Sequence, residues 1–180
     1  GQSLLPVLRM RLNAPEVVID LGRIEALRGV RDDGDAIVIG AMTTHHDVQH
    51  DPLVKEHALL ISKAETEVAD PQVRHRGTFG GALAHADPAG DLGAPALALD
   101  AEFVVAGQNG TRTIAATDFF VDLFTTDRGH ACGVLDVILR LKIRAQCASS
   151  LRSGARYVSG FGHASRALSS VAPGSSGNPK

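Results

Sequence analysis

The segment whose residues could most readily bind a ligand is a glycine-containing stretch, residues 74–82, which reads Arg-His-Arg-Gly-Thr-Phe-Gly-Gly-Ala. Gly80 and Gly81 carry no side chains, so backbone N–H groups there can approach a ligand closely, and concave runs of such groups bind phosphate oxygens. Thr78 adds a hydroxyl group. The spacing matches neither a Walker A loop nor a GxGxxG fingerprint. On spacing alone, a tight connection between two elements explains the glycines equally well.

Three charged side chains lie in or near this stretch in the sequence. Asp91 stands at the expected start of a helix, where it can accept hydrogen bonds from ribityl or ribose hydroxyls, or else cap that helix. Arg74 and Arg76 can hold the glycine segment through carbonyl groups or contact a partner subunit. Solvated surface positions account for these two arginines equally well.

Eight histidines raise the question of a metal site. His45, His46 and His50 fall on one expected helix, and His46 and His50 have the i, i+4 spacing of a zinc-binding pair. No Glu stands beside His46 to act as a base, and the pattern assures no third ligand. A solvent-exposed helix face is the better interpretation, so no metal ligand is assigned. A histidine-ligated metal hydrolase is a weak hypothesis.

Composition narrows the class of protein. The chain is 44% hydrophobic and 21% charged, which excludes a wholly disordered or collagen-like chain. No apolar run reaches the roughly 18 residues of a membrane span and no signal peptide opens the sequence, so a cytoplasmic location is expected. With no Trp and one Tyr, a base-stacking nucleic-acid surface is disfavoured. Cys132 and Cys147 form no CxxC motif, so any iron–sulfur cluster must sit on another polypeptide.

Turn signals and apolar periodicity predict an α+β arrangement. Two hairpins are expected, one joining 27–30 to 36–40 and one joining 102–106 to 111–115. Apolar spacing predicts a helix from about Pro52 to Ala69. The remaining predicted elements are a short buried strand at Val17–Ile19, a short helix capped by Thr43 or Thr44, a glycine-rich functional loop over 77–92, a helix over 88–99, a short helix from Thr117 and a closing strand over 134–143.

The composition changes at about residue 143. All 20 acidic residues fall at or before Asp136, and 20 of the 36 residues from Ala145 to Lys180 are Ser, Gly or Ala. Such a composition buries too little apolar surface to offset chain entropy. We therefore expect a folded domain over residues 1–143 and a basic, poorly ordered tail over residues 144–180.

Four motifs, in order, carry a family resemblance. They are Gly-Gln-Ser-Leu-Leu-Pro at 1–6, Ile-Gly-Ala-Met-Thr-Thr-His-His at 39–46, Gln-Val-Arg-His-Arg-Gly-Thr-Phe-Gly-Gly at 72–81 and Ala-Asp-Pro-Ala-Gly-Asp-Leu at 86–92. Together they resemble the FAD-binding domain of molybdenum hydroxylases. The resemblance is closest to the medium, flavin subunit of aerobic carbon monoxide dehydrogenase and more distant to xanthine dehydrogenase. It covers residues 1–143.

The resemblance implies a fold and a site. The fold is the FAD-binding domain of the vanillyl-alcohol-oxidase type, in which the flavin lies between two α+β subdomains. The strand–helix–strand unit that precedes the first flavin loop in the family is absent, so we expect a truncated domain whose N-terminal subdomain is largely missing. Ala82 replaces the usual Asn or Ser, which removes one polar contact. The implied FAD-binding residues are Gly1, Gln2 and Ser3 of the first flavin loop, Thr78, Phe79, Gly80, Gly81 and Ala82 of the second, and Asp91 at the ribityl chain.

The resemblance also implies a function as an oxidoreductase subunit. In the family, substrate is hydroxylated at a molybdopterin cofactor on a large subunit. Electrons then pass through 2Fe–2S clusters on a small subunit to FAD on the medium subunit, and on to quinone, NAD or oxygen. This role requires no acid–base catalyst in the present chain. The alternative is a non-catalytic remnant that binds no flavin, and the chain alone is expected to bind FAD weakly or not at all.

Overall fold

The protein is built around a five-stranded antiparallel sheet. A computed structural model describes residues 1–107, 110–122, 125–127 and 137–142. The strands follow the spatial order β1-β2-β7-β3-β4, with antiparallel neighbours throughout. Their bounds are β1 Val30–Asp32, β2 Ala36–Ile39, β7 Val137–Lys142, β3 Glu102–Gly107 and β4 Gly110–Ala115. A separate ribbon pairs β5 (Phe120–Asp122) with β6 (Thr125–Thr126).

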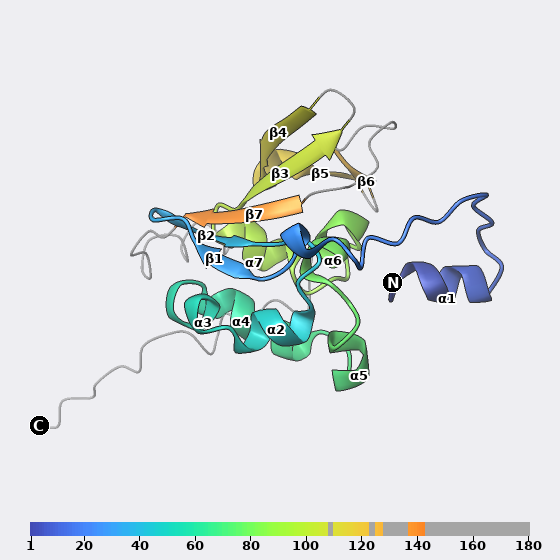
Figure 1. Ribbon diagram of the computed structural model, residues 1–180, viewed down its shortest axis with the longest axis horizontal. Coiled ribbons are helices and arrows are strands. Elements are labelled where there is room, and N and C mark those ends of the chain that lie inside the picture. Colours follow the sequence, from blue (N-terminus) through green and yellow to red (C-terminus); the bar gives the residue numbers. More distant parts are fainter. Residues whose placement is uncertain (108–109, 123–124, 128–136, 143–180) are drawn as a thin grey trace, which may run out of the picture.

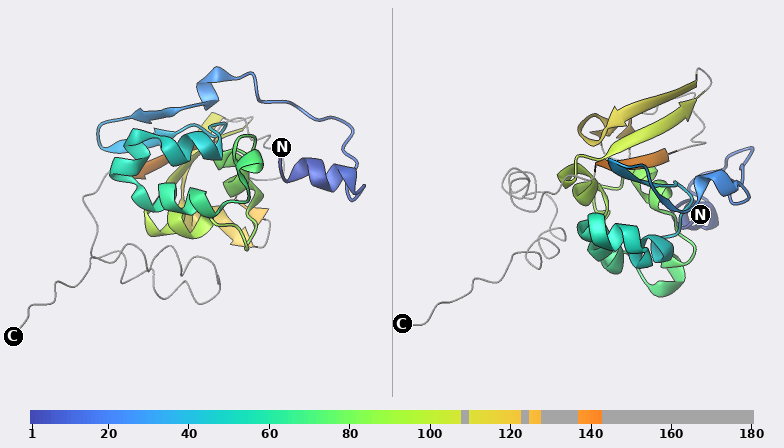
Figure 2. Two further views of the ribbon diagram at one scale, coloured as in Figure 1. Left: turned by 90° about the horizontal axis from the view of Figure 1, so that it is seen from below. Right: turned by 60° about the vertical axis from the view of Figure 1, so that its left-hand side comes forward.

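Short helices pack against the sheet. Figure 1 and both views of Figure 2 show α2, α3 and α4 side by side in one layer. Contacts between α4 and α7 and between α6 and β7 link this layer to the rest of the body. The helices are α1 Leu4–Arg9, α2 His45–His50, α3 Pro52–His57, α4 Leu59–Glu67, α5 Pro71–Arg74, α6 Phe79–His85, α7 Gly93–Ala98 and α8 Ala116–Phe119, with a 3₁₀ turn at Glu25–Leu27.

The hydrophobic core fills the space between the sheet and the helices. Phe103 and Phe119 stack there with ring centroids 4.1 Å apart, and Phe120 meets both rings edge-on. Such pairs add about 0.5–1.5 kcal/mol to the stabilisation from burial alone. The largest fully buried apolar side chains are Phe79, Phe103, Phe119, Ile37, Ile39, Ile61 and Leu83.

Both predicted hairpins are confirmed. In the β1–β2 turn, Gly34 has a φ of +76°, and its N–H donates to the Asp32 carboxylate at 2.8 Å. The β3–β4 hairpin pairs Phe103 with Ile114, while its connection, residues 108 and 109, lies outside the described residues. The predicted closing strand is present as β7, but it enters the middle of the sheet between β2 and β3.

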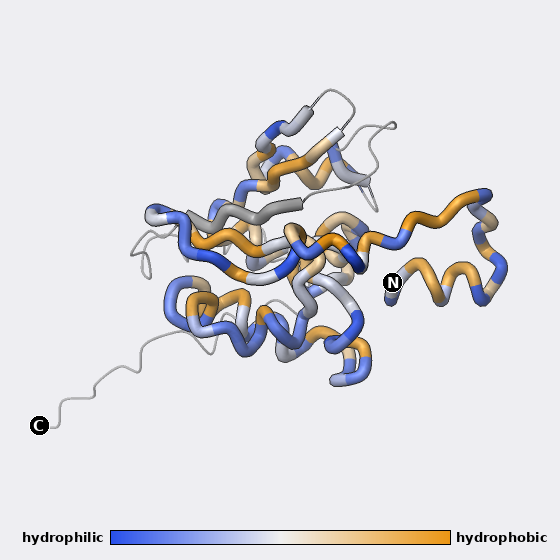
Figure 3. Tube along the Cα trace, in the orientation of Figure 1, coloured by the Kyte–Doolittle hydropathy of each residue, from blue (hydrophilic) through white to orange (hydrophobic). Residues whose placement is uncertain are grey.

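The predicted buried strand at Val17–Ile19 is wrong. Val17, Val18 and Ile19 are 75%, 58% and 74% exposed and form no strand. β-branched residues favour a strand only where a neighbouring strand and a packed face receive them, and this segment has neither in the described part of the chain. The segment belongs to an N-terminal arm, residues 1–24, that contains no buried residue. Figure 3 shows its apolar stretches standing off the body.

The predicted helix from Pro52 to Ala69 is interrupted at Ala58. This residue has φ −137° and ψ 47°, outside the helical region, so α3 ends at His57 and α4 begins at Leu59. Both helices bury an apolar face, which is why the apolar periodicity continues across the break. The predicted cap on α2 is confirmed, because the Thr44 side chain accepts a hydrogen bond from the Asp47 N–H.

The predicted glycine-rich loop over 77–92 is only partly a loop, because α6 occupies residues 79–85. Glycine in a helix interior costs about 1 kcal/mol relative to alanine, but α6 also buries Phe79 and Leu83, and this burial outweighs the poor propensity. The helix predicted over 88–99 is shorter, as α7, and Leu92 rather than Asp91 occupies its N-cap position.

The predicted tail over 144–180, and the domain boundary that precedes it, lie outside the described residues. The short helix predicted from Thr117 begins one residue earlier, as α8. Within the described ranges, no helix combines the length and apolar character that a bilayer crossing requires.

Candidate functional site

The start of α6 is fixed by the connection between β2 and α2. Residues 77–80 run antiparallel to residues 41–45, with a β-bridge between Thr44 and Thr78. Three backbone hydrogen bonds join the segments: His45 N–H to Gly77 O at 3.1 Å, Phe79 N–H to Thr43 O at 2.9 Å and Gly80 N–H to Ala41 O at 3.0 Å. The sequence motifs at 39–46 and 72–81 therefore form one structural unit.

Gly80 is required by packing inside this unit. A Cβ at Gly80 would lie 2.6 Å from the Ala41 Cβ and 2.9 Å from the Ala41 carbonyl oxygen, so the two segments touch where a side chain would stand. The Gly80 N–H already donates to that carbonyl. This glycine is buried and gives no free donor to a ligand.

Gly81 is exposed and is less closely packed than Gly80. Within 4 Å, a Cβ there would meet only the Thr78 side chain, with its Oγ1 at 2.6 Å. The Gly81 N–H and the Thr78 hydroxyl form no hydrogen bond with any described residue. An accessible N–H and an accessible hydroxyl therefore stand together at the start of α6. This donor pair fits an anionic or carbonyl oxygen of a ligand.

The other predicted residues of the second flavin loop have different surroundings. Phe79 is fully buried, so its side chain belongs to the core and only its backbone could contact a ligand. Ala82 is half-buried and packs against the core. Asp91 is partly buried in the connection between α6 and α7, and its charge acts on Glu65 of α4.

Gly1, Gln2 and Ser3 lie at the exposed end of the N-terminal arm. Figure 1 and both views of Figure 2 place this end on the same side of the body as α6, while α1 points away from the body. α1 makes no hydrogen bond to the body in the described part of the chain. The two predicted flavin loops thus share one side of the molecule, but the first is not held against it.

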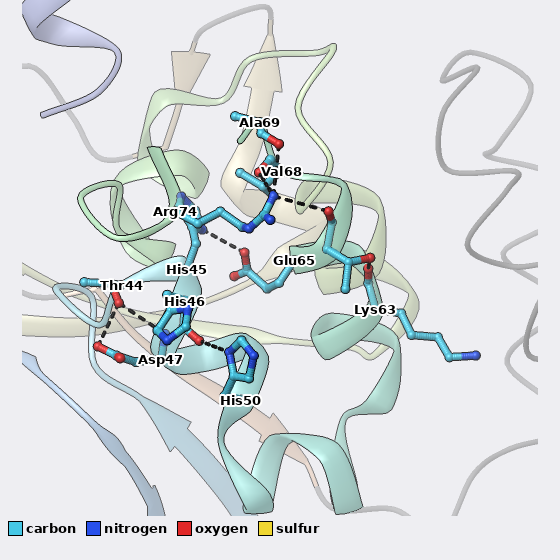
Figure 4. Close-up of polar contacts among 11 residues, drawn as sticks. Thr44, His45, His46, Asp47, His50, Lys63, Glu65, Val68, Ala69 and Arg74 are labelled. Carbon is cyan, nitrogen blue, oxygen red and sulfur yellow. Dashed lines mark hydrogen bonds and ion pairs between the residues drawn. The ribbon is translucent and has the colours of Figure 1, made fainter. Parts of the chain in front are cut away.

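Sequence reasoning missed a buried pair beneath the start of α6, between His45 and Glu65. The predicted exposed position of His45 is wrong: this residue is 4% exposed and Glu65 is fully buried. His45 Nδ1 and Glu65 Oε2 are 2.8 Å apart. Figure 4 draws this contact as a dashed line between the two side chains. The available signal was the apolar stripe of α4, because Glu65 follows Ile61 at i+4 and so shares its buried face.

The electrostatics of Glu65 follow from this burial. Burial raises the pKa of Glu65 above its ordinary value, and the hydrogen bond and charge of His45 offset part of the rise. Arg74 lowers the same pKa and Asp91 raises it. The other carboxyl oxygen, Oε1, has no hydrogen-bond partner among the described residues.

Arg74 binds carbonyl groups, but they belong to residues 66–69 and not to the glycine segment that its sequence position suggested it would hold. Its Nη1 donates to Val68 O at 2.9 Å and to Ala69 O at 3.0 Å, with a longer contact to Thr66 O. Figure 4 shows this guanidinium at the C-terminal end of α4. Thr66 lies in the last turn of α4 and Val68 is its C-cap, so Arg74 stabilises the end of this helix and ties α5 to it.

His46, His50 and His75 form a histidine cluster. The His46 ring lies 4.4 Å from the His50 ring and 3.9 Å from the His75 ring, measured between centroids. Loss of hydration, followed by the His75 and His50 charges, lowers the pKa of His46. The exposed face predicted for His50 is confirmed. No three His, Cys, Asp or Glu side chains in the described ranges are arranged to hold a metal ion.

Comparison with known families identifies the class. A family model for the FAD-binding domain in molybdopterin dehydrogenase matches residues 1–141. The chain belongs to this family, and its relatives include medium chains of carbon monoxide dehydrogenase and glyceraldehyde dehydrogenase, which are oxidoreductase subunits. The α+β fold class and the family resemblance are thereby confirmed.

Individual relatives agree with this assignment. The carbon monoxide dehydrogenase medium chain of Hydrogenophaga pseudoflava is 45% identical over 126 residues, covering 70% of this chain and 44% of that protein. The nicotine 6-hydroxylase medium subunit of Paenarthrobacter nicotinovorans is 44% identical, with the same coverage of each chain. This chain therefore spans less than half the length of these curated relatives.

Solved structures share the fold. Carbon monoxide dehydrogenase from Hydrogenophaga pseudoflava, in a form that lacks the Mo-pyranopterin moiety, matches with a TM-score of 0.77 and 42% identity, over 81% of this chain and 50% of that one. Quinoline 2-oxidoreductase from Pseudomonas putida 86 matches with a TM-score of 0.76 and 36% identity, over the same shares. The individual FAD contacts stay predictions.

Proposed function

We propose that this chain binds FAD as part of the medium subunit of a molybdenum-containing hydroxylase or dehydrogenase. The observation that carries the proposal is the pair of free donors at the start of α6, the Thr78 hydroxyl and the Gly81 N–H. They lie on a segment held rigidly against residues 41–45, inside the region that the family model matches. Rigid donors at an exposed glycine suit a diphosphate or a flavin carbonyl.

The residues of the site have distinct proposed tasks. Thr78 and Gly81 donate to the cofactor, and Gly80 holds their backbone against Ala41. Asp91 accepts from hydroxyls of the ribityl chain, and Gly1, Gln2 and Ser3 close over the cofactor from the N-terminal arm. Phe79 and Ala82 shape the segment from the core side. When bound, FAD accepts electrons singly and delivers them in pairs, so this chain needs to bind and orient it rather than supply a catalytic base.

The proposed partners are a large subunit with a molybdopterin cofactor and a small subunit with 2Fe–2S clusters. Several relatives are described as medium chains or FAD subunits, which implies other subunits in their complexes. We propose that electrons pass from the clusters through FAD to an acceptor, in the cytoplasm, and that the functional domain covers residues 1–143. The separation of Cys132 and Cys147 supports clusters on another chain.

A second candidate is a remnant that binds no flavin. The observation in its favour is the N-terminal arm, in which Leu5, Met10, Leu12 and Val17 are 53%, 62%, 72% and 75% exposed. Apolar side chains on this scale normally pack against protein. An arm without such packing cannot hold Gly1, Gln2 and Ser3 in place over a cofactor.

Titration of the 180-residue chain with FAD separates the two candidates. We expect weak binding, seen as quenching of flavin fluorescence, because no hydrogen bond holds Gly1, Gln2 and Ser3 against the start of α6 in the described part of the chain. Gly81→Val should abolish it, since the side chain would fill the space beside Thr78. Gly93→Ala is the control, because a Cβ there meets only Phe120 at an ordinary 3.8 Å. No quenching by the unaltered chain at millimolar FAD would favour the remnant.

A further inference from the structure

The buried carboxyl of Glu65 lacks a packing explanation. Glu65 is fully buried in α4, and only one of its two carboxyl oxygens has a hydrogen-bond partner among the described residues. Burying a half-satisfied carboxyl is costly compared with an apolar side chain of similar size. Because this buried carboxyl lowers the stability of the fold, it is a candidate for a functional role.

His45 connects this carboxyl to the cofactor segment. Its Nδ1 is held by Glu65 Oε2, which fixes the orientation of the imidazole ring. The opposite edge of the ring lies against Gly77, where a Cβ would be 2.8 Å from Cδ2 and 3.1 Å from Nε2. The backbone N–H of His45 also donates to the Gly77 carbonyl. The ring therefore sets the position of the residue immediately before Thr78.

The two free donors depend on that position. Thr78 follows Gly77 directly, and the Gly81 N–H stands one turn further along α6. A rotated or displaced imidazole would move Gly77, and with it the Thr78 hydroxyl and the first turn of α6. Asp91, the proposed ribityl contact, raises the pKa of Glu65 through its charge.

We propose that His45 and Glu65 are a positioning pair for the FAD site, holding the Thr78 and Gly81 donors in place through the contact of the imidazole with Gly77. This inference rests on the proposed function for its ligand, but its structural part can be measured without flavin. Neither residue touches the cofactor in this arrangement. Their effect passes through the backbone of residues 77–80.

Two measurements on the 180-residue chain test the pair. The first is amide hydrogen exchange across residues 76–82, with the β3 segment as an internal reference. The second is FAD affinity by fluorescence titration. Glu65→Ala should raise exchange of the Phe79 and Gly80 amides several-fold without the same rise in β3, and should weaken FAD binding by about tenfold or more. Glu65→Gln keeps a hydrogen-bond partner for His45 and should restore most of both properties.

Two matched variants separate a local effect of the pair from a loss of folding. Glu67→Ala removes an exposed carboxyl from the same helix and should change neither the exchange nor the affinity. If Glu65→Ala does not fold, Gly77→Ala is measured in its place, because its methyl group would displace the His45 ring without removing the buried carboxyl. It should also raise exchange in residues 76–82 and weaken FAD binding.

The outcomes separate this inference from the proposed function. If the unaltered chain binds no FAD, the proposed function fails, and local exchange alone decides whether the pair positions the segment. If the chain binds FAD but the exchange of 76–82 and the affinity are unchanged in Glu65→Ala, the positioning role is refuted while the proposed function stands. A uniform rise in exchange across the whole chain, in a Glu65→Ala variant that still folds, would also refute it, because it would show a purely global effect.

Discussion

The neighbouring glycines 80 and 81 are expected to respond in opposite ways to the same substitution. A Cβ on Gly80 would lie 2.6 Å and 2.7 Å from the Ala41 Cβ and Cα, which are backbone-anchored atoms that cannot rotate away. A Cβ on Gly81 would meet only the Thr78 Oγ1, which moves aside by a χ1 rotation. One glycine is needed for packing, and the other is free for a ligand.

The magnitudes follow from these contacts. Overpacking of a filled interior costs about 1–3 kcal/mol, and displacing the Gly80 N–H from the Ala41 carbonyl adds up to about 1 kcal/mol. The better helix propensity of alanine returns at most about 1 kcal/mol. Gly80→Ala should therefore lower the free energy of unfolding by about 1–3 kcal/mol. Gly81→Ala should leave it unchanged or raise it by up to about 1 kcal/mol.

Urea unfolding followed by circular dichroism measures both changes, with fluorescence titration of FAD on the same samples. Gly81→Ala should weaken FAD binding at undiminished stability, because its methyl group occupies the space in front of the donor pair. Equal stability losses at the two positions would refute the assignment of Gly80 to packing. Undiminished FAD binding by Gly81→Ala would refute the assignment of Gly81 to the ligand.

Three further changes have defined outcomes. Asp91→Ala should weaken FAD binding by about 1–3 kcal/mol in a titration, the cost of losing a charged hydrogen-bond partner; a change in thermal stability alone would point to a structural role. Asp51→Ala should lower the free energy of unfolding by about 1 kcal/mol, because the carboxylate caps α3 through the N–H groups of Leu53 and Val54. Burial raises the folded-state pKa of Glu65 above its ordinary 4.5, so the carboxyl group loses its proton at a higher pH in the folded chain than in the unfolded chain. The stabilisation is full below about pH 4.5 and is lost as pH rises through the raised pKa; urea unfolding over a pH series should show this fall relative to Glu65→Gln, and parallel curves would contradict it.

Local chemistry explains which elements could be predicted from the sequence. The hairpin at Asp32–Gly34 and the Thr44 cap depend on residues within a few positions of one another, so their signals lie in short windows. Val17–Ile19 carries the same kind of local strand signal, yet a strand also needs a partner that no local window contains. α6 was missed because its glycines favour a loop, while the burial of Phe79 and Leu83 depends on the rest of the fold.

The features of the candidate site also divide into those that short sequence windows predict and those that depend on the fold. Residues 78–82 and Asp91 could be proposed as site residues from motifs, because the family resemblance rests on contiguous residues. The separate tasks of Gly80 and Gly81 were not predictable, since they depend on Ala41, which lies about forty positions earlier. The buried pair was also missed, because His45 and Glu65 stand on different helices and only the fold brings them to 2.8 Å.

The position of β7 has a consequence for how the chain folds. Among the described strands, the β1–β2 hairpin and the β3–β4 hairpin do not pair with each other, and β7 lies between them and pairs with both. Ile39 pairs with Leu139, so the sheet closes only after a loop of 100 residues has been brought together. Such long-range pairing slows folding, because the entropy of loop closure is lost before the contact is gained. During synthesis on the ribosome, this sheet can therefore form only after residues 137–142 have emerged, and a stop codon before Val137 would remove the strand that joins the two hairpins.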